Sequence, residues 1–495
     1  MTVPGGAKNF LSRPALPVVG IMLAIALAMR LLWLDRLVGI DGDEAWYGAL
    51  GQQWMSGHFV YWATPTGNYP GPIHAALVGI EQLVMPREFV ALRLPSVVAS
   101  IGAIALAGLI AWRHAGPAAA CWAVVLMAAL PGNIIYARYG WDPSYSGLLL
   151  LGGVAVALEG WAVATVALFA LAVLTHPTNI FGAPLLLLAL LAGERRRGRA
   201  LVSARSGAAG VALLLAGVAV LSTAVQATRA VTLGGALERL ASPSQWFAYL
   251  FQYVRLLAGD PFFEQFAGKG YGALLSLVDV VGAAAVVGAA VAGVIAVRRE
   301  GLSPRAAILL GTAAMVAAYG LVAGPAPLTA PTERYGFVLI APSALALAFA
   351  VPRMSRWPEA TALGTAGTAL LAATALLYLV PLHDGARPMS WFLRTGTSEP
   401  HARVADRLLA ERAKGPVRVV AEDWFLMWPL RYRLNGIDGV RIDLADASAT
   451  GANFAFAYAD SPLDRALAAQ SGGRPPLLTT HDMAGRPISR LWRRP

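Results

Sequence analysis

The chain has 495 residues, of which 57% are hydrophobic and 14% are charged, and its mean hydropathy is +0.58. This is too little polar surface for a water-soluble protein of this size, so the composition predicts an integral membrane protein. The formal net charge of +11 would suit a nucleic-acid partner. Much of the arginine, however, lies in short loops between hydrophobic runs, where positive charge sets membrane orientation, so we expect no nucleic-acid binding.

The first predicted element is the apolar run at 15–34, which follows Lys8 and Arg13. The run is longer than the hydrophobic part of a cleaved signal peptide, which has about 7–15 residues, and further apolar runs follow it. We therefore predict an uncleaved signal anchor with the N-terminus in the cytoplasm. The single cysteine, Cys121, excludes an intramolecular disulfide.

Hydrophobic runs continue along most of the chain and predict a polytopic α-helical membrane protein with about eleven transmembrane helices. Some runs are shorter than the roughly 20 residues that a perpendicular span needs, so their boundaries are approximate. The runs lie near 15–35, 89–112, 117–132, 143–158, 160–175, 178–193, 208–228, 271–297, 305–323, 336–351 and 359–381.

The apolar segment 72–85 is ambiguous, because as a helix it would reach only about 21 Å across a core of about 30 Å. If it crossed the membrane, the arginine loop at 195–199 would face outward, against the positive-inside rule. We therefore predict an interfacial or re-entrant helix. The loops 36–88, 133–142 and 229–270 and the tail from 382 then face outward.

The chain divides at 381 into a transmembrane domain, 1–381, and a smaller outward domain, 382–495. In the tail, strand-like runs at 417–420, 440–443 and 454–457 alternate with helix-like stretches at 400–413, 423–434 and 461–470. This alternation predicts a small α/β domain.

The first outer loop begins with Asp41-Gly-Asp43-Glu44-Ala-Trp46-Tyr47. Three carboxylates within four residues at a membrane surface cost free energy, so they are expected where a ligand or a reaction needs them. This favours a functional site. A solvated helix start, with Asp41 and Asp43 as capping residues, explains the charge equally well. Asp41 and Asp43 also suit a divalent cation, although two carboxylates alone specify no metal.

The second outer loop, 133–142, adds Arg138 and Asp142 together with Tyr136, Tyr139 and Trp141. Sugar transfer needs a carboxylate to take the acceptor proton, cations for the departing phosphate and aromatic faces for sugar rings. The alternative is that Asp142 and the following proline simply start the next helix.

The order of several motifs resembles the GT-C superfamily of protein O-mannosyltransferases and lipid A aminoarabinose transferases. The motifs are Asp43-Glu44-Ala-Trp46-Tyr47, Gly67-Asn-Tyr69-Pro70-Gly-Pro72-Ile-His74, Arg93-Leu-Pro-Ser96 and Ala137-Arg138-Tyr139 with Asp142. Thr332-Glu333-Arg334-Tyr335 and the aromatic segment 424–432 are similar to further features of these proteins. The resemblance covers most of the chain and is strongest over 40–145. It implies a membrane transferase that uses a polyprenyl-phosphate sugar, with essential acidic residues in the first two outer loops.

The resemblance also implies roles for single residues. Asp43 corresponds to the general base, with Glu44 beside it, and Asp142 to the second acid, which orients the acceptor or the base. The chain departs from the pattern at Tyr69-Pro70-Gly71, where several lipid-modifying members have Glu-Lys-Pro, so a phosphate-binding lysine is missing. We expect other cations to replace it, and the substrate-binding set to be Arg138, Arg334, Arg255, Lys269, Tyr47, Tyr69, Tyr139 and His74.

The predicted function is an inverting glycosyltransferase in a bacterial-type inner membrane, with its site on the outer face. Its partners would be a polyprenyl-phosphate sugar donor, membrane lipid and a lipid, glycan or protein acceptor. The alternative is a secondary transporter or lipid flippase, because intramembrane charges and broken helices also mark transport paths. A membrane-anchored binding protein whose tail does the work is a third interpretation. Few charges lie within the spans and no internal repeat is evident, which favours the transferase.

Overall fold

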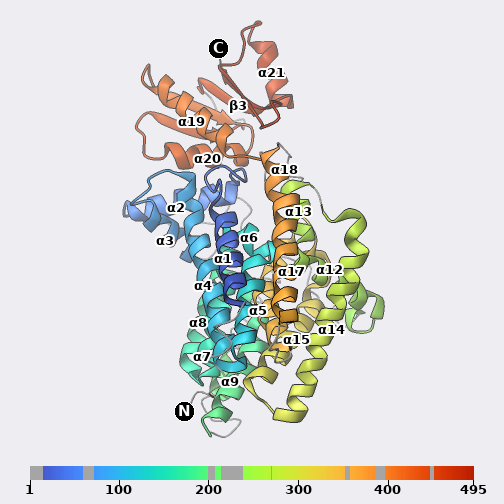
Figure 1. Cartoon of the computed structure of the whole chain (residues 1–495). Coiled ribbons are helices and arrows are strands. Elements are labelled where there is room, and N and C mark those ends of the chain that lie inside the picture. Colours follow the sequence, from blue (N-terminus) through green and yellow to red (C-terminus); the bar gives the residue numbers. More distant parts are fainter. Residues whose placement is uncertain are drawn as a thin grey trace.

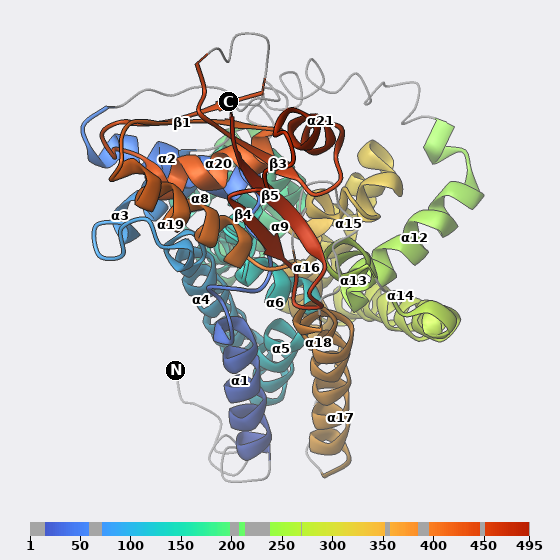
Figure 2. The ribbon, with the colours of Figure 1, turned by 90° about the horizontal axis from the view of Figure 1, so that it is seen from above.

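The structure is a computed structural model that describes residues 15–58, 72–198, 207–212, 238–268, 270–351, 357–384, 396–445 and 451–494. Figure 1 shows a long helical bundle with a small mixed domain at one end. Seen from that end, α12 and α14 lie at one edge of the bundle, while α1 and α17 lie side by side at another (Figure 2).

Helices occupy the predicted hydrophobic runs, except that the run at 208–228 lies largely outside the described residues. Proline stands at the first or second position of α5, α6, α9 and α15, where its missing N–H costs nothing. The helices of the bundle are α1 (Ala15–Leu31), α4 (Phe89–Ala115), α5 (Pro117–Ala129), α6 (Pro131–Ala137), α7 (Ser146–Leu158), α8 (Ala162–Thr175), α9 (Ala183–Arg196), α14 (Leu275–Glu300), α15 (Pro304–Ala323), α16 (Ile340–Ala350) and α17 (Trp357–Thr374).

Among the described residues, 6 helices are long and apolar enough to cross a membrane, or 7 if α5 and α6 form one span bent by 55°. Three shorter apolar helices lie at Pro17–Leu31, Asp142–Leu158 and Ala162–Thr175. Much of α14 is apolar and exposed, as a helix that faces lipid would be. The polytopic helical fold is therefore confirmed, while the number eleven stays a prediction.

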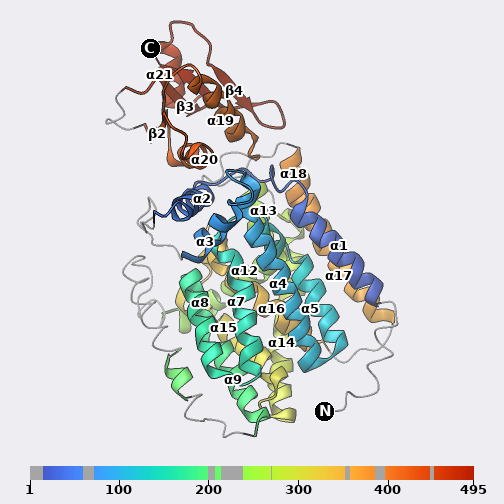
Figure 3. The ribbon, with the colours of Figure 1, turned by 90° about the vertical axis from the view of Figure 1, so that its left-hand side faces the viewer.

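Two short helices, α2 (Gly42–Met55) and α3 (Pro72–Glu81), lie at the end of the bundle beneath the small domain (Figure 3). They approach closely through glycine: a Cβ on Gly51 would stand 2.6 Å from the Ala75 carbonyl oxygen. The ambiguous segment therefore forms a helix of 10 residues. Its place at the membrane interface remains a prediction.

The connections at this end consist of short helical pieces, several of which carry site residues. They are η2 (Asp142–Tyr145), η3 (Pro177–Gly182), α12 (Pro243–Ala258), α13 (Asp260–Ala267), η4 (Gly272–Leu274), η5 (Ala326–Leu328), η6 (Glu333–Leu339), η7 (Ala375–Leu379) and α18 (Val380–His383).

The C-terminal part folds as the small α/β domain that the alternating pattern predicts. Its sheet has five strands in the order β2-β1-β3-β5-β4, with β1 parallel to β2 and β3, and β5 antiparallel to β3 and β4. In the central register, Val419 of β1 pairs with Ile442 and Phe454. The last two strands were not expected. The elements are α19 (Glu399–Arg412), β1 (Val417–Ala421), α20 (Trp424–Leu434), β2 (Val440–Leu444), β3 (Phe454–Tyr458), α21 (Pro462–Gln470), β4 (Leu478–His481) and β5 (Pro487–Arg493).

The small domain rests on the bundle through α20, which packs against α2. Tyr432 donates to the Glu88 carbonyl oxygen at 2.7 Å, and Gln52 donates to the Tyr432 carbonyl oxygen at 3.2 Å. A Cβ on Gly48 would stand 2.6 Å from the Tyr432 ring, so this contact needs glycine. The helix α2, which carries Asp43 in its first turn, is thus held between the bundle and the small domain.

Candidate active site

Asp43 and Asp142 come from two separate segments of the chain and lie close enough for their charges to interact. Asp43 lies in the first turn of α2, and Tyr47 follows it by one turn on the same face of the helix. Asp142 opens η2 and is buried. Its carboxylate accepts a hydrogen bond from Tyr47 and interacts with the charges of Asp43 and Arg334. The sequence-predicted acids therefore belong to one cluster.

Arg334, in η6, brings a positive charge to these carboxylates from a distant part of the chain. Its guanidinium stacks 4.9 Å from the ring centres of both Trp141 and Tyr335, and it donates to the Tyr335 hydroxyl at 3.3 Å. Burial raises the pKa of Asp43 to about 6, and the positive charge of Arg334 opposes that rise. Asp43 is therefore mostly ionised near neutral pH and can accept a proton.

Asp41 caps the start of α2 and has little capacity left for a ligand. One carboxylate oxygen accepts from the Asp43 N–H at 3.3 Å, and the other accepts from the Tyr139 hydroxyl at 2.5 Å. Burial, and next the charge of Asp43, raise the pKa of Asp41 well above its usual range. No cluster of three metal-binding side chains occurs within the described ranges, so Asp41 and Asp43 find no third acidic, histidine or cysteine ligand there.

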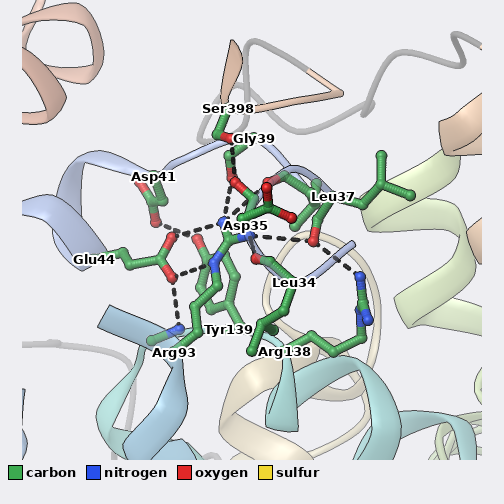
Figure 4. A network of polar contacts seen from close by, with 12 residues as sticks. Leu34, Asp35, Leu37, Gly39, Asp41, Glu44, Arg93, Arg138, Tyr139 and Ser398 are labelled. Atoms are coloured by element: carbon green, nitrogen blue, oxygen red, sulfur yellow. Dashed lines mark hydrogen bonds and ion pairs between the residues drawn. The ribbon is translucent and has the colours of Figure 1, made fainter. Parts of the chain in front are cut away.

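Glu44 forms a buried ion pair with Arg93 (Figure 4). The two side chains meet at 2.8 and 3.1 Å, and Glu44 also accepts from the Gly140 N–H at 2.8 Å. A side chain at Gly140 would stand 2.5 Å from the Leu92 carbonyl oxygen, so glycine is required there. Both Glu44 oxygens thus already accept hydrogen bonds inside the protein, which favours a structural role, and the expected catalytic role of Glu44 stays a prediction.

Arg138 is fully buried and binds main-chain oxygens at the end of α1 and in the segment that follows it. It donates to the carbonyls of Met29, Arg30, Leu32 and Leu37 at 2.7, 3.2, 2.8 and 3.0 Å. Carbonyls at a helix end have no partner within the helix, and Arg138 supplies these donors. This geometry favours a structural role for Arg138, and its expected contact with the carrier phosphate stays a prediction.

Two further expected ligands lie in the protein interior. The Tyr139 hydroxyl donates its hydrogen bond to Asp41. His74 pairs with the Tyr145 hydroxyl at 2.7 Å, and its ring centre lies 4.6 Å from that of Tyr47. Burial lowers the pKa of His74 to about 4, so the ring is neutral at physiological pH. His74 supports the face of α2 that carries Tyr47.

Arg255, another expected cation, is paired with a carboxylate outside the cluster. Arg255, in α12, binds both carboxylate oxygens of Asp279 at 2.9 and 2.7 Å, which balances its charge. Tyr69 and Lys269 lie outside the described residues.

Two residues beside the cluster have weaker signals in the sequence. Glu333 is buried next to Arg334, with the Tyr136 hydroxyl facing it. Its signal in the sequence is its place in the segment Thr332-Glu333-Arg334-Tyr335, which resembles a feature of the GT-C proteins. Tyr145, the partner of His74, was not expected; its only signal was a position one helical turn after Asp142.

The comparisons with known proteins bear on the fold. No family model matches the chain, and no curated protein matches its sequence. Among solved structures, the chain is similar to ArnT from Cupriavidus metallidurans bound to undecaprenyl phosphate, with 15% sequence identity and a TM-score of 0.52 over 96% of this chain and 97% of that chain. The apo state of the same protein aligns with 14% identity and a TM-score of 0.43 over the same shares. The chain therefore has the fold of ArnT, a helical bundle with a small domain at one end, along almost its whole length.

Proposed function

We propose that the chain is a membrane glycosyltransferase that moves a sugar from a polyprenyl-phosphate carrier to an acceptor hydroxyl. One observation carries the proposal: Asp43, Asp142 and Arg334 converge from three distant segments at the end of the bundle that bears the small domain. A solved protein of the same fold binds undecaprenyl phosphate, which supports a carrier of that class. The fold alone would not identify the reaction, which depends on the site.

Asp43 is the proposed general base. Its carboxylate takes the proton of the acceptor hydroxyl as the acceptor oxygen attacks the anomeric carbon. The bond from that carbon to the carrier phosphate breaks at the same time, and polyprenyl phosphate leaves with the bonding electrons. One displacement of this kind inverts the anomeric configuration. Asp142, held by Tyr47, orients the acceptor hydroxyl toward Asp43.

Arg334 is the proposed phosphate ligand. It is only partly buried, and its positive charge interacts with the carboxylate of Asp43. A fixed positive charge stabilises the negative charge that develops on the departing phosphate. In this proposal Arg334 takes the place of the lysine that the chain lacks, while Arg138 and Arg93 hold the site in position.

An apolar cavity of about 600 Å³ is suited to the prenyl chain. Residues from α12, α14, α15 and α16 line it, including Trp246, Val287, Val316 and Leu347. The helix α16, which contributes Ser343 and Leu347 to this wall, follows directly after η6, which carries Arg334. A carrier with its chain in this cavity would bring its phosphate toward the outward end of the bundle.

Transfer of label tests the proposal. The purified protein would be reconstituted with a polyprenyl-phosphate sugar labelled in the sugar, together with a cell-envelope extract as the source of acceptor. We expect the label to leave the carrier with the native chain and to stay on it with Asp43→Asn. If the native chain leaves the sugar on its carrier but moves that lipid between leaflets, the chain is a flippase and the proposal fails.

A further inference from the structure

The cavity at the far end of α2 is separate from the proposed active site. It has a volume of about 700 Å³, and residues of α2, of the segment after α3 and of the turn after α20 line it. Gln53 in its wall follows Asp43 by ten residues, about 15 Å along a helix. The described residues of the wall include Gln53, Gln82, Leu83, Arg87, Asn435 and Gly436, and none belongs to the acidic cluster.

Arg87 gives this cavity a positive charge that the described residues do not balance. No hydrogen bond or ion pair of its side chain is found within the described ranges, and no carboxylate there lines the cavity. Neighbouring Arg433, by contrast, pairs with Glu88 at 3.0 Å. Arg87 also has a left-handed backbone with φ of 65°, which is unusual for a residue with a long side chain. The fold thus places an unpaired guanidinium at a cavity, where an anion would be stabilised.

Gln82 adds a buried polar group that needs a partner. Its side chain is 6% exposed; the amide nitrogen donates to the Gly48 carbonyl at 3.1 Å, and the amide oxygen has no partner among the described residues. A buried acceptor without a donor is unfavourable, so a ligand hydroxyl at this wall would be favoured. Arg87 and Gln82 together suit a ligand that carries both a phosphate and a hydroxyl group.

The surface beside the cavity is apolar. Ile80, Leu83 and Val84 are 55%, 68% and 79% exposed, and Leu83 also lines the cavity. Exposed apolar side chains next to a cationic cavity match an amphipathic molecule, with its head group in the cavity and its chains along the protein surface. A free anion would use Arg87 but would leave the apolar surface uncovered.

From these contacts we infer that this cavity is a second lipid site, which binds the phosphate and hydroxyl groups of an anionic membrane glycerophospholipid. Arg87 binds the phosphate, Gln82 accepts from a head-group hydroxyl, and the acyl chains cover Ile80, Leu83 and Val84. Asn435 lines the same cavity and donates to Gln52 of α2 at 2.8 Å. A bound lipid would therefore also strengthen the junction between α2 and the small domain.

The test uses the full chain in nanodiscs of phosphatidylcholine with added phosphatidylglycerol, and counts retained lipids by native mass spectrometry. Arg87→Gln should bind phosphatidylglycerol about ten-fold more weakly, the effect of losing a charge-assisted contact. Arg465→Gln, on α21 of the small domain, is the matched control and should bind like the native chain. Leu83→Gln should also weaken lipid binding while keeping the arginine.

Two results would overturn the inference. The first is equal retention of phosphatidylglycerol by the native chain, Arg87→Gln and Leu83→Gln. The second comes from competition: inorganic phosphate displaces the bound lipid at the same or a lower concentration than soluble short-chain phosphatidylglycerol does. That result would identify a site for a free anion. Both results are independent of sugar transfer, so the inference can fail while the proposed function stands.

Discussion

Arg93 and Arg138 donate to the same main-chain oxygen, the carbonyl of Leu37, at 3.1 and 3.0 Å. Arg93 comes from α4 and Arg138 from the end of α6, so the segment between α1 and α2 is fixed from two sides (Figure 4). Arg93 also donates to Leu34, Val38 and Gly39. The position of Asp43 thus depends on two arginines that do not touch it.

The first prediction concerns the buried pair of Arg93 and Glu44. Arg93→Ala should lower the free energy of unfolding by about 3–5 kcal/mol, because it leaves the Glu44 carboxylate buried and unpaired. Arg93→Met combined with Glu44→Leu should be less destabilising than Arg93→Ala alone. Thermal unfolding of the purified variants measures the difference, and Arg403→Ala, from the exposed pair with Glu399, is the control that should change stability by less than about 1 kcal/mol. A stable Arg93→Ala would contradict this role.

The second prediction separates Arg138 from Arg334. Arg138→Ala should lower the unfolding temperature clearly, since buried carbonyls lose their donors, but the folded variant should bind polyprenyl phosphate with nearly native affinity. Arg334→Ala should do the reverse: stability changes little, and affinity for the carrier falls by about ten-fold or more. Equilibrium binding to purified variants decides between them. If Arg138→Ala alone weakens binding, the phosphate is held by Arg138 and the structural role is wrong.

The third prediction is the pH dependence of transfer. Asp43 acts in its ionised form and its pKa is about 6, so the rate at saturating donor should fall as the pH drops below that value. Arg334 lowers the pKa of Asp43, and Arg334→Gln should therefore shift the acidic limb to higher pH. The rate of sugar transfer by the native chain and by Arg334→Gln is measured between acidic and neutral pH. These profiles show whether the rate falls at low pH and in which direction the midpoint of that fall moves in the variant. An unchanged midpoint in the variant would show that the two groups are not coupled.

The fourth prediction is the orientation in the membrane. Cysteine at Ser244 or Ala466, in a variant with Cys121 replaced by Ala, should react with an impermeant thiol reagent from outside the inner membrane, whereas cysteine at Arg196 should not. Ala466 is exposed on α21, while Ser461 caps that helix and is better left intact. Protection of both outer positions would reverse the assignment, and it would indicate that α3 crosses the membrane.

Much of the fold follows from simple sequence patterns. Long apolar runs give the bundle helices because a lipid-exposed backbone must satisfy its own hydrogen bonds. The alternating pattern of the tail gives β1, β2 and β3. The strands β4 and β5 were missed because their sequences, Leu478–His481 and Pro487–Arg493, mix polar and apolar residues without a buried run.

The site was harder to predict, because it depends on pairings between distant residues. The spacing of the acidic motif cannot tell which carboxylate faces solvent; only the packing of α4 shows that Glu44 meets Arg93 while Asp43 stays partly accessible. In the same way, Arg138 stands four residues before Asp142, which suggested one helical face. The helix α6 ends at Ala137, so Arg138 and Asp142 do not share a helix, and Arg138 binds the end of α1 and the segment after it instead.

The central claim is that Asp43, and not its neighbour Asp41, removes the acceptor proton. The most direct measurement compares single-turnover sugar transfer by Asp43→Asn and Asp41→Asn, each first shown to be folded and to bind polyprenyl phosphate. We expect Asp43→Asn to lose transfer almost completely while keeping carrier affinity, because it removes the base and preserves the shape of the side chain. Asp41→Asn should retain substantial transfer. Near-native transfer by Asp43→Asn, or an inactive Asp41→Asn beside an active Asp43→Asn, would contradict the account.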